Sequence, residues 1–104
     1  MKRLNIQEIE EIVAKYFNVS PSPLHLRCRR NEIVIPRMIT MFLAHKYTFL
    51  STVELGRYYG RHHTTVIYAL KEMEDRFIDD RIFRAKLKSI ESVILEDRKL
   101  EEIL

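Results

Sequence analysis

Both glycines of this 104-residue chain, Gly56 and Gly60, lie four residues apart inside the stretch from Ser51 to Phe77. Ser51 followed by Glu54 has the pattern of a capping box, in which each side chain satisfies a backbone amide at the start of a helix. Gly60 suits a turn with positive φ, which other residues resist. The stretch therefore predicts a short helix, a tight glycine turn and a longer second helix. We expect the tyrosines just before Gly60, at positions 58 and 59, to be partly buried and to brace the turn.

The residues after the turn have the pattern of an amphipathic helix. Apolar residues recur at helical spacing, and polar residues gather on the other side, near the start of the helix. This combination is typical of the recognition helix of a DNA-binding helix-turn-helix. The apolar stripe consists of Val66, Ala69, Leu70, Met73 and Phe77, and the polar side of Thr64, Thr65, Tyr68, Lys71 and Glu72.

Two further amphipathic segments precede this unit. In Asn5 to Phe17 we expect the glutamates in water and a buried stripe of Ile6, Ile9, Ile12, Val13, Tyr16 and Phe17. Residues 18–23 contain two prolines and two serines, which end the helix. Glu32 to Tyr47 is apolar on several sides and should lie at the centre of the fold. Because proline is tolerated only in the first turn of a helix, Pro36 predicts that the regular helix begins near Ile33 to Ile35.

A last helix is expected after the unit, capped by Asp79 and Asp80. The sequence leaves open whether residues 96–104 extend this helix, fray or form the seam of a homodimer. Together with the absence of strand alternation, these segments predict one all-α domain of about five helices over residues 1–104. The inner stripe of the last helix is expected to contain Ile82, Phe83, Leu87, Ile90, Val93 and Ile94.

Positive charge is concentrated around the helix-turn-helix. The whole chain has a net charge of +3, but residues 27–71 hold eight Lys and Arg against two Glu, a net of +6. Such a block is expected for a polyanionic partner, because Lys and Arg displace counterions from phosphates. A solvated basic face without a partner is the weaker alternative, since the charge coincides with a recognition-helix pattern. Arg27, Arg29 and Arg30 favour phosphate contact or insertion into a minor groove.

Other classes of function find no support in the sequence. No run approaches the ~20 apolar residues of a membrane span, and we expect a cytoplasmic location. The single cysteine, Cys28, has no disulfide partner and is expected to be a small packing residue. Without paired carboxylates or a phosphate-binding glycine loop, we expect no enzyme, no nucleotide and no cofactor. His62 and His63 would point about 100° apart on a helix, so a metal site is not expected.

A specific motif combination lies between Pro36 and Glu74, in PRMITMFLAHKYTFLSTVELGRYYGRHHTTVIYALKEME. Pro36-Arg37 is followed, a helix and a half later, by Gly60-Arg61 and then by His-Thr-Thr-Val at positions 63–66. This combination resembles the C-terminal DNA-binding domain of the bacterial chromosomal replication initiator DnaA. The resemblance covers about Ile6 to Ile94 and implies a helix-turn-helix of the DnaA C-terminal, Trp-repressor-like type.

The resemblance also implies roles for individual residues. Residues 63–65 would contact base edges in the major groove, and Arg29 would enter the neighbouring minor groove. Arg37 would contact the sugar-phosphate backbone, and residues 51–53 would bind phosphate at the positive end of a helix. The complete predicted DNA-binding set is Arg27, Arg29, Arg30, Arg37, Ser51, Thr52, Val53, Arg61, His62, His63, Thr64, Thr65, Tyr68 and Lys71.

The sequence departs from the family pattern in three places. The ATPase domain has no counterpart in these residues, so we expect the chain by itself not to form a nucleotide-dependent initiator filament. The family has Gly-Gly-Arg-Asp-His where this chain has Gly60-Arg61-His62-His63. An imidazole at position 62 favours guanine N7 or O6, or a phosphate, over an exposed base amine. Met38 replaces a glutamine that would touch phosphate. We therefore expect DNA binding with an altered or relaxed preference.

These observations predict sequence-preferring binding of double-stranded DNA, in replication control or transcription regulation. Contact with replication or regulatory proteins would fit this role, and no membrane is involved. The alternative is a protein–protein adaptor whose basic face is incidental. Salt separates the two, because only the DNA-binding protein predicts an affinity for DNA that falls steeply with salt.

Overall fold

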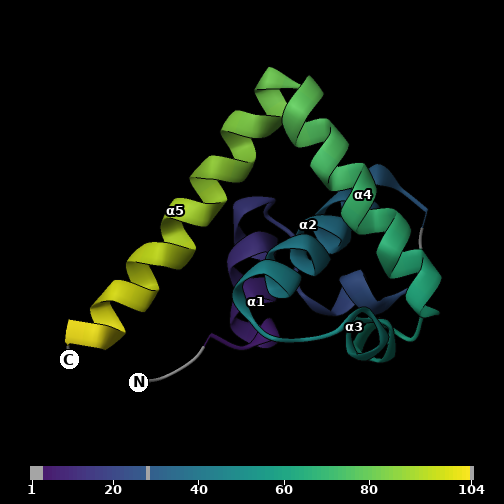
Figure 1. Ribbon diagram of the computed structural model, residues 1–104, viewed down its shortest axis with the longest axis horizontal. Helices are drawn as coiled ribbons and strands as arrows, with labels where there is room; N and C mark the ends of the chain where they lie inside the picture. The colour runs from purple at the N-terminus through teal and green to yellow at the C-terminus, as the bar shows by residue number, and fades with distance from the viewer. Residues whose placement is uncertain (1–3, 28, 104) are drawn as a thin grey trace.

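The computed structural model describes residues 4–27 and 29–103, with side chains up to residue 96. Cys28, with its predicted packing role, lies outside these residues. Within them the chain forms five α-helices, one short 3-10 helix and no strand, which confirms the all-α prediction (Figure 1). The elements in chain order are α1 (Ile6–Tyr16), η1 (Ser22–His25), α2 (Asn31–Tyr47), α3 (Thr52–Tyr59), α4 (His63–Asp79) and α5 (Arg81–Ile103).

Helix α2 lies at the centre of the fold, as the sequence predicted. It packs against α1, η1, α3 and α4, and its residues Ile39, Met41 and Leu43 are fully buried. The expected stripe of α4 also faces this core, with Val66 and Met73 fully buried. Helices α4 and α5 meet at one corner and diverge from it, and α5 returns to pack against α1 (Figure 1). The core therefore holds α4 by one side and leaves its other side exposed.

Helix α2 begins at Asn31, two to four residues earlier than predicted, so Pro36 is its sixth residue. A proline there cannot donate to the carbonyl of Glu32, one turn before it. Because Glu32 is exposed, water can replace the missing donor. The prediction that Pro36 lies in the first turn was therefore wrong, and the proline is accommodated in the second turn.

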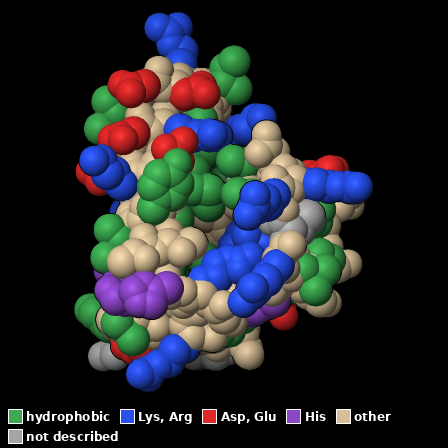
Figure 2. All heavy atoms as spheres, turned by 90° about the vertical axis from the view of Figure 1, so that its right-hand side faces the viewer, with side chains coloured by type: hydrophobic (Ala, Val, Ile, Leu, Met, Phe, Trp, Pro, Cys, Tyr) green, Lys and Arg blue, Asp and Glu red, His purple; other side chains and the backbone are tan. Residues whose placement is uncertain are grey.

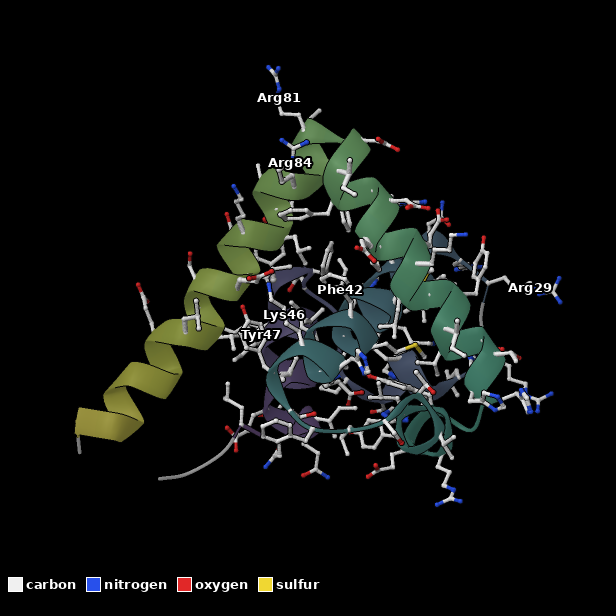
Figure 3. All side chains as sticks on the ribbon, in the orientation of Figure 1. Arg29, Phe42, Lys46, Tyr47, Arg81 and Arg84 are labelled. Carbon is white, nitrogen blue, oxygen red and sulfur yellow. The ribbon has the colours of Figure 1, made fainter. Side chains whose placement is uncertain are left out.

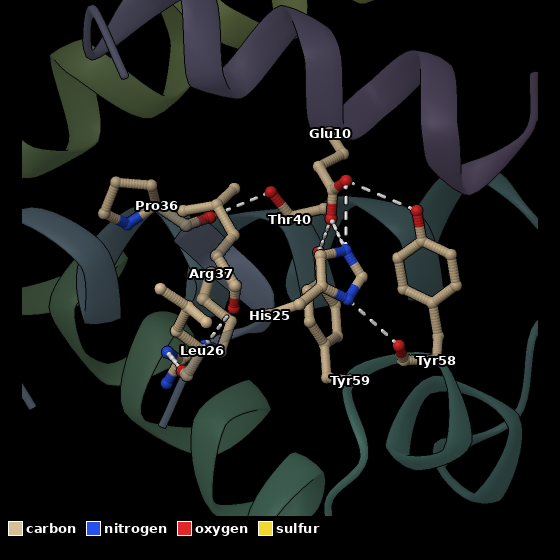
Figure 4. Close-up of polar contacts among 9 residues, drawn as sticks. Glu10, His25, Leu26, Pro36, Arg37, Thr40, Tyr58 and Tyr59 are labelled. Carbon is tan, nitrogen blue, oxygen red and sulfur yellow. Dashed lines mark hydrogen bonds and ion pairs between the residues drawn. The ribbon is translucent and has the colours of Figure 1, made fainter. Parts of the chain in front are cut away.

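Glu10 contradicts the expectation that every glutamate of α1 faces water, because it is only 4% exposed. Its carboxylate accepts hydrogen bonds from the hydroxyl groups of Tyr59, at 2.6 Å, and Tyr58, at 3.3 Å (Figure 4). His25 places Nε2 3.0 Å from the same carboxylate and Nδ1 3.2 Å from the carbonyl oxygen of Tyr58. These four residues, the Glu10 cluster, join α1, η1 and α3. Tyr58 is half-buried, as predicted, whereas Tyr59 is buried.

The Glu10 cluster changes the acidity of both tyrosines. Burial and the neighbouring Glu10 carboxylate raise the pKa of Tyr58 to about 12. The same two causes raise the pKa of Tyr59 still further above its ordinary value, because this ring is more deeply buried and its hydrogen bond is shorter. Both phenols therefore stay protonated as donors to Glu10 over the physiological pH range.

Helix α5 begins with the predicted cap, since Oδ1 of Asp80 accepts from the backbone N–H of Phe83 at 3.0 Å. The helix continues to Ile103, so residues 96–103 belong to α5. Ile82 and Val93, expected in the inner stripe, are 71% and 43% exposed. The stripe is narrower than predicted because α4 and α1 cover only one side of α5. None of the helices in the described part of the chain is long and apolar enough to cross a membrane.

Candidate nucleic-acid interface

The turn between α3 and α4 depends on both glycines. Gly60 has φ 64° and ψ 37°, in the left-handed region that the sequence predicted. The backbone N–H of Arg61 donates to the carbonyl of Gly56 at 2.7 Å, which closes the end of α3. A Cβ atom at Gly56 would lie 2.5 Å from the carbonyl oxygen of Arg61. Gly60 therefore supplies the turn, and Gly56 allows the turn to pack against α3.

The start of α3 has the predicted capping box. The backbone N–H of Glu54 donates to Oγ of Ser51 at 3.1 Å, and the N–H of Ser51 donates to Oε1 of Glu54 at 3.3 Å. Ser51 and Val53 are exposed and Thr52 is half-buried. The residues predicted to bind phosphate are therefore accessible at this helix end.

Helix α4 begins at His63, and His62 is its N-cap residue in an extended backbone conformation. Nδ1 of His62 accepts from the backbone N–H of Thr64 at 3.3 Å and lies 2.8 Å from Oγ1 of Thr64. The expected 100° separation assumed that both histidines are helical, which was wrong because His62 precedes the helix. The two rings lie with their centroids 4.2 Å apart. In the part of the chain that the structure describes, no group of three or more His, Cys, Asp or Glu could hold a metal ion.

The exposed face of α4 carries most of its predicted contact residues. Thr64, Tyr68 and Lys71 are exposed at helical spacing, and Thr65 is exposed beside them, whereas His63 is half-buried. Ile67 is 49% exposed on this same face and was not among the predicted residues. Its spacing of three residues from Thr64 is the signal that could have identified it.

The loop between η1 and α2 lies beside the start of α4. Arg27 and Arg29 line a surface hollow together with Arg61, His62 and Thr65. Arg30 is exposed in the same loop, at the N-cap position of α2, where its side chain makes no capping hydrogen bond. Figure 2 shows Lys and Arg side chains across this face with histidine side chains beside them, and acidic side chains gathered mainly toward the top of the view. In Figure 3, Arg29 points away from the body of the protein. The structure thus brings the predicted basic loop and the predicted recognition helix to one face.

Two of the predicted DNA-contacting arginines bind the backbone of this loop. Arg37 is 5% exposed, and its Nε and Nη2 donate to the carbonyl oxygens of Leu24, at 2.7 Å, and Leu26, at 2.6 Å. Arg61 donates from Nη2 to the same Leu26 carbonyl at 3.1 Å. Arg37 lines the same hollow but is almost wholly buried, and its phosphate contact stays a prediction. No sequence signal could have revealed these bonds, because backbone carbonyls are common to all residues.

Residues 6–73 match the family model described as the bacterial dnaA protein helix-turn-helix. The chain belongs to this family.

Curated relatives extend the match over most of the chain. The chromosomal replication initiator protein DnaA of Bartonella quintana is 38% identical over 96 residues, which are 91% of this chain and 19% of the relative. The protein of the same name from Bacteroides thetaiotaomicron is 35% identical over 94 residues, 89% of this chain and 20% of the relative. The one from Brucella abortus is 39% identical over 94 residues, 89% of this chain and 19% of the relative. The chain therefore spans about a fifth of the length of these DnaA relatives.

Proposed function

We propose that this DnaA-type domain binds double-stranded DNA with sequence preference, in the control of replication or transcription. One observation carries the proposal: Arg27 and Arg29 of the loop and His62 and Thr65 at the start of α4, more than thirty residues apart in the chain, line a single basic hollow beside an exposed helix face. A solvated basic face would not require the two to converge. The relatives' name, chromosomal replication initiator protein, supports DNA replication as the setting.

In this proposal, α4 enters the major groove with its exposed face. Residues 62–65 and Tyr68 would meet base edges, and Lys71 would meet phosphate further along the helix. Ile67 adds an apolar group to this face, which suits the C5-methyl group of thymine. These contacts would supply the sequence preference.

The loop arginines would supply much of the affinity. Arg27, Arg29 and Arg30 are exposed, so they can approach phosphates or the neighbouring minor groove without rearrangement of the core. The start of α3 provides a further phosphate site, because the first amides of a helix have no partner within it and carry partial positive charge. The loop arginines and the start of α3 would then contact the DNA backbone on the two sides of the groove that holds α4.

Fluorescence anisotropy with labelled duplexes tests this proposal. Sites are first selected from random duplexes, and affinity is then measured between 50 and 200 mM salt. We expect a steep fall in affinity with salt, and a loss of roughly one unit of salt slope for each phosphate-contacting arginine removed. Arg27→Ala should show this effect, whereas Arg81→Ala should not, because Arg81 is exposed at the distant α4–α5 corner (Figure 3). Negligible DNA binding at low salt would refute the proposal and favour a protein-binding adaptor.

A further inference from the structure

The two ring nitrogens of His62 have different roles in the structure. Nδ1 faces the start of α4, where it accepts from the backbone N–H of Thr64 at 3.3 Å. A backbone N–H can only donate, so the nitrogen that receives it carries no proton. The hydroxyl of Thr64, 2.8 Å from the same Nδ1, can rotate to donate as well. In the neutral ring, the proton therefore resides on Nε2.

The His62 ring is exposed, yet its position is restricted. Its own cap bond holds one edge, and the ring of His63 lies against it at 4.2 Å with a tilt of 39°. His62 also lines the hollow that contains Arg27, Arg29 and Thr65. The cap thus presents a single N–H donor, in a fixed tautomer, at the tip of the helix that is proposed to enter the groove.

We propose that His62 selects a guanine, with Nε2–H donating to guanine N7 in the major groove while Nδ1 caps α4. This inference rests on the proposed DNA binding and names the base that the start of α4 prefers. Guanine presents two adjacent acceptors, N7 and O6, whereas cytosine presents an amino donor that opposes an N–H. Adenine places an amino donor beside its N7, which makes it the poorer partner. Phosphate is the less suitable acceptor, because the neutral ring competes there with the four arginines that line the same hollow.

Two substitutions separate the reading role from the capping role. The side-chain amide of asparagine reaches as far as Nδ1, and that of glutamine reaches as far as Nε2. His62→Asn therefore keeps a good N-cap acceptor and loses the outer donor. His62→Gln keeps an outer donor and loses the cap. The two variants form a matched pair, and thermal unfolding of each reports the cap independently of DNA.

The binding measurements use sites selected by the wild-type protein, in buffer at pH 8. We expect His62→Asn to bind the selected guanine site roughly 3- to 10-fold more weakly, the range of one hydrogen bond, with the thermal midpoint unchanged. On a duplex with that guanine replaced by cytosine, wild type and His62→Asn should bind equally. His62→Gln should keep the guanine preference and show a lower thermal midpoint.

A modified base identifies the atom that is read. Replacing the selected guanine with 7-deazaguanine removes N7 alone, so it should weaken the wild-type protein and leave His62→Asn unaffected. Equal wild-type binding of guanine and 7-deazaguanine overturns the assignment. An intact guanine preference in His62→Asn also overturns it, because His62 would then act only as a helix cap. An equal loss of affinity on all sequences overturns it as well, because it would indicate that His62 contacts phosphate. Failure of the wild type to bind any duplex refutes the proposed function itself, whereas salt-dependent binding without a guanine effect refutes only the role of His62.

Discussion

Replacing Arg37 with methionine is expected to lower the free energy of unfolding by about 2–4 kcal/mol. Arg37 donates to the carbonyls of Leu24 and Leu26 at 2.7 and 2.6 Å, and hydrogen bonds from a charged group contribute roughly 1.5–3 kcal/mol each. Two such bonds sum to about 3–6 kcal/mol. The Leu26 carbonyl keeps its bond from Arg61, so the expected loss lies at or somewhat below the lower end of that sum. Methionine retains most of the apolar stem, so the change isolates the lost donors.

Urea unfolding followed by circular dichroism at 222 nm measures this difference. Arg29→Met is the matched control, because the same substitution falls on an exposed arginine of the loop that Arg37 holds. We expect its effect on stability to stay within about 0.5 kcal/mol. If Arg37→Met and Arg29→Met unfold at the same free energy, the guanidinium of Arg37 does not hold the loop in solution, and the reasoning is wrong.

The same pair of variants separates stability from DNA binding. Arg37→Met should weaken binding to all sequences alike, because the bonds of Arg37 to Leu24 and Leu26 place the loop that carries the exposed arginines. Arg29→Met should weaken binding while leaving the urea transition in place. A loss of sequence preference in Arg37→Met alone would contradict a role through the loop.

Three further expectations concern the turn, the buried tyrosines and the recognition helix. Gly56→Ala should lower the free energy of unfolding by about 1–3 kcal/mol, because its Cβ would lie 2.5 Å from the carbonyl oxygen of Arg61. Gly60→Ala has open space around its Cβ and should lower this free energy by only about 1–2 kcal/mol, through its φ of +64°. Thermal unfolding of both variants checks these values. Because the pKa of Tyr58 is raised to about 12 from 10.0, its contribution to stability is present below pH 10 and is lost as the pH rises toward 12. Absorbance at 295 nm should show Tyr58 and Tyr59 ionising only at or above about pH 12, and their ionisation near pH 10 in the folded protein would contradict this. Thr65→Ala should reduce the preference between duplexes by ~1–3 kcal/mol, and an equal loss on all duplexes would argue against base contact.

Local features of the helix-turn-helix could be predicted from the sequence because their causes lie within a few residues. The Ser51–Glu54 capping box joins groups three residues apart. Gly60 can adopt its positive φ because it has no side chain to clash with the backbone. The apolar stripe of α4 follows from the 3.6-residue period of a helix, so Val66 and Met73 were correctly placed in the core. The exposed face of α4 followed from the same period.

The partners of the charged residues could not be predicted in this way. Glu10 has the spacing of a surface glutamate, and only the folded chain brings His25 and the two tyrosines of α3 to its carboxylate. Arg37 and Arg61 are residues of the type that binds phosphate, yet both donate to the carbonyl of Leu26. Periodicity reports which side of a helix is wet, but the partner of a buried charge depends on groups that tertiary packing brings together from distant parts of the chain. The sequence by itself therefore determined the helices and the exposed face of α4, and the tertiary structure decided which charged residues are buried and which arginines stay exposed or hold the loop.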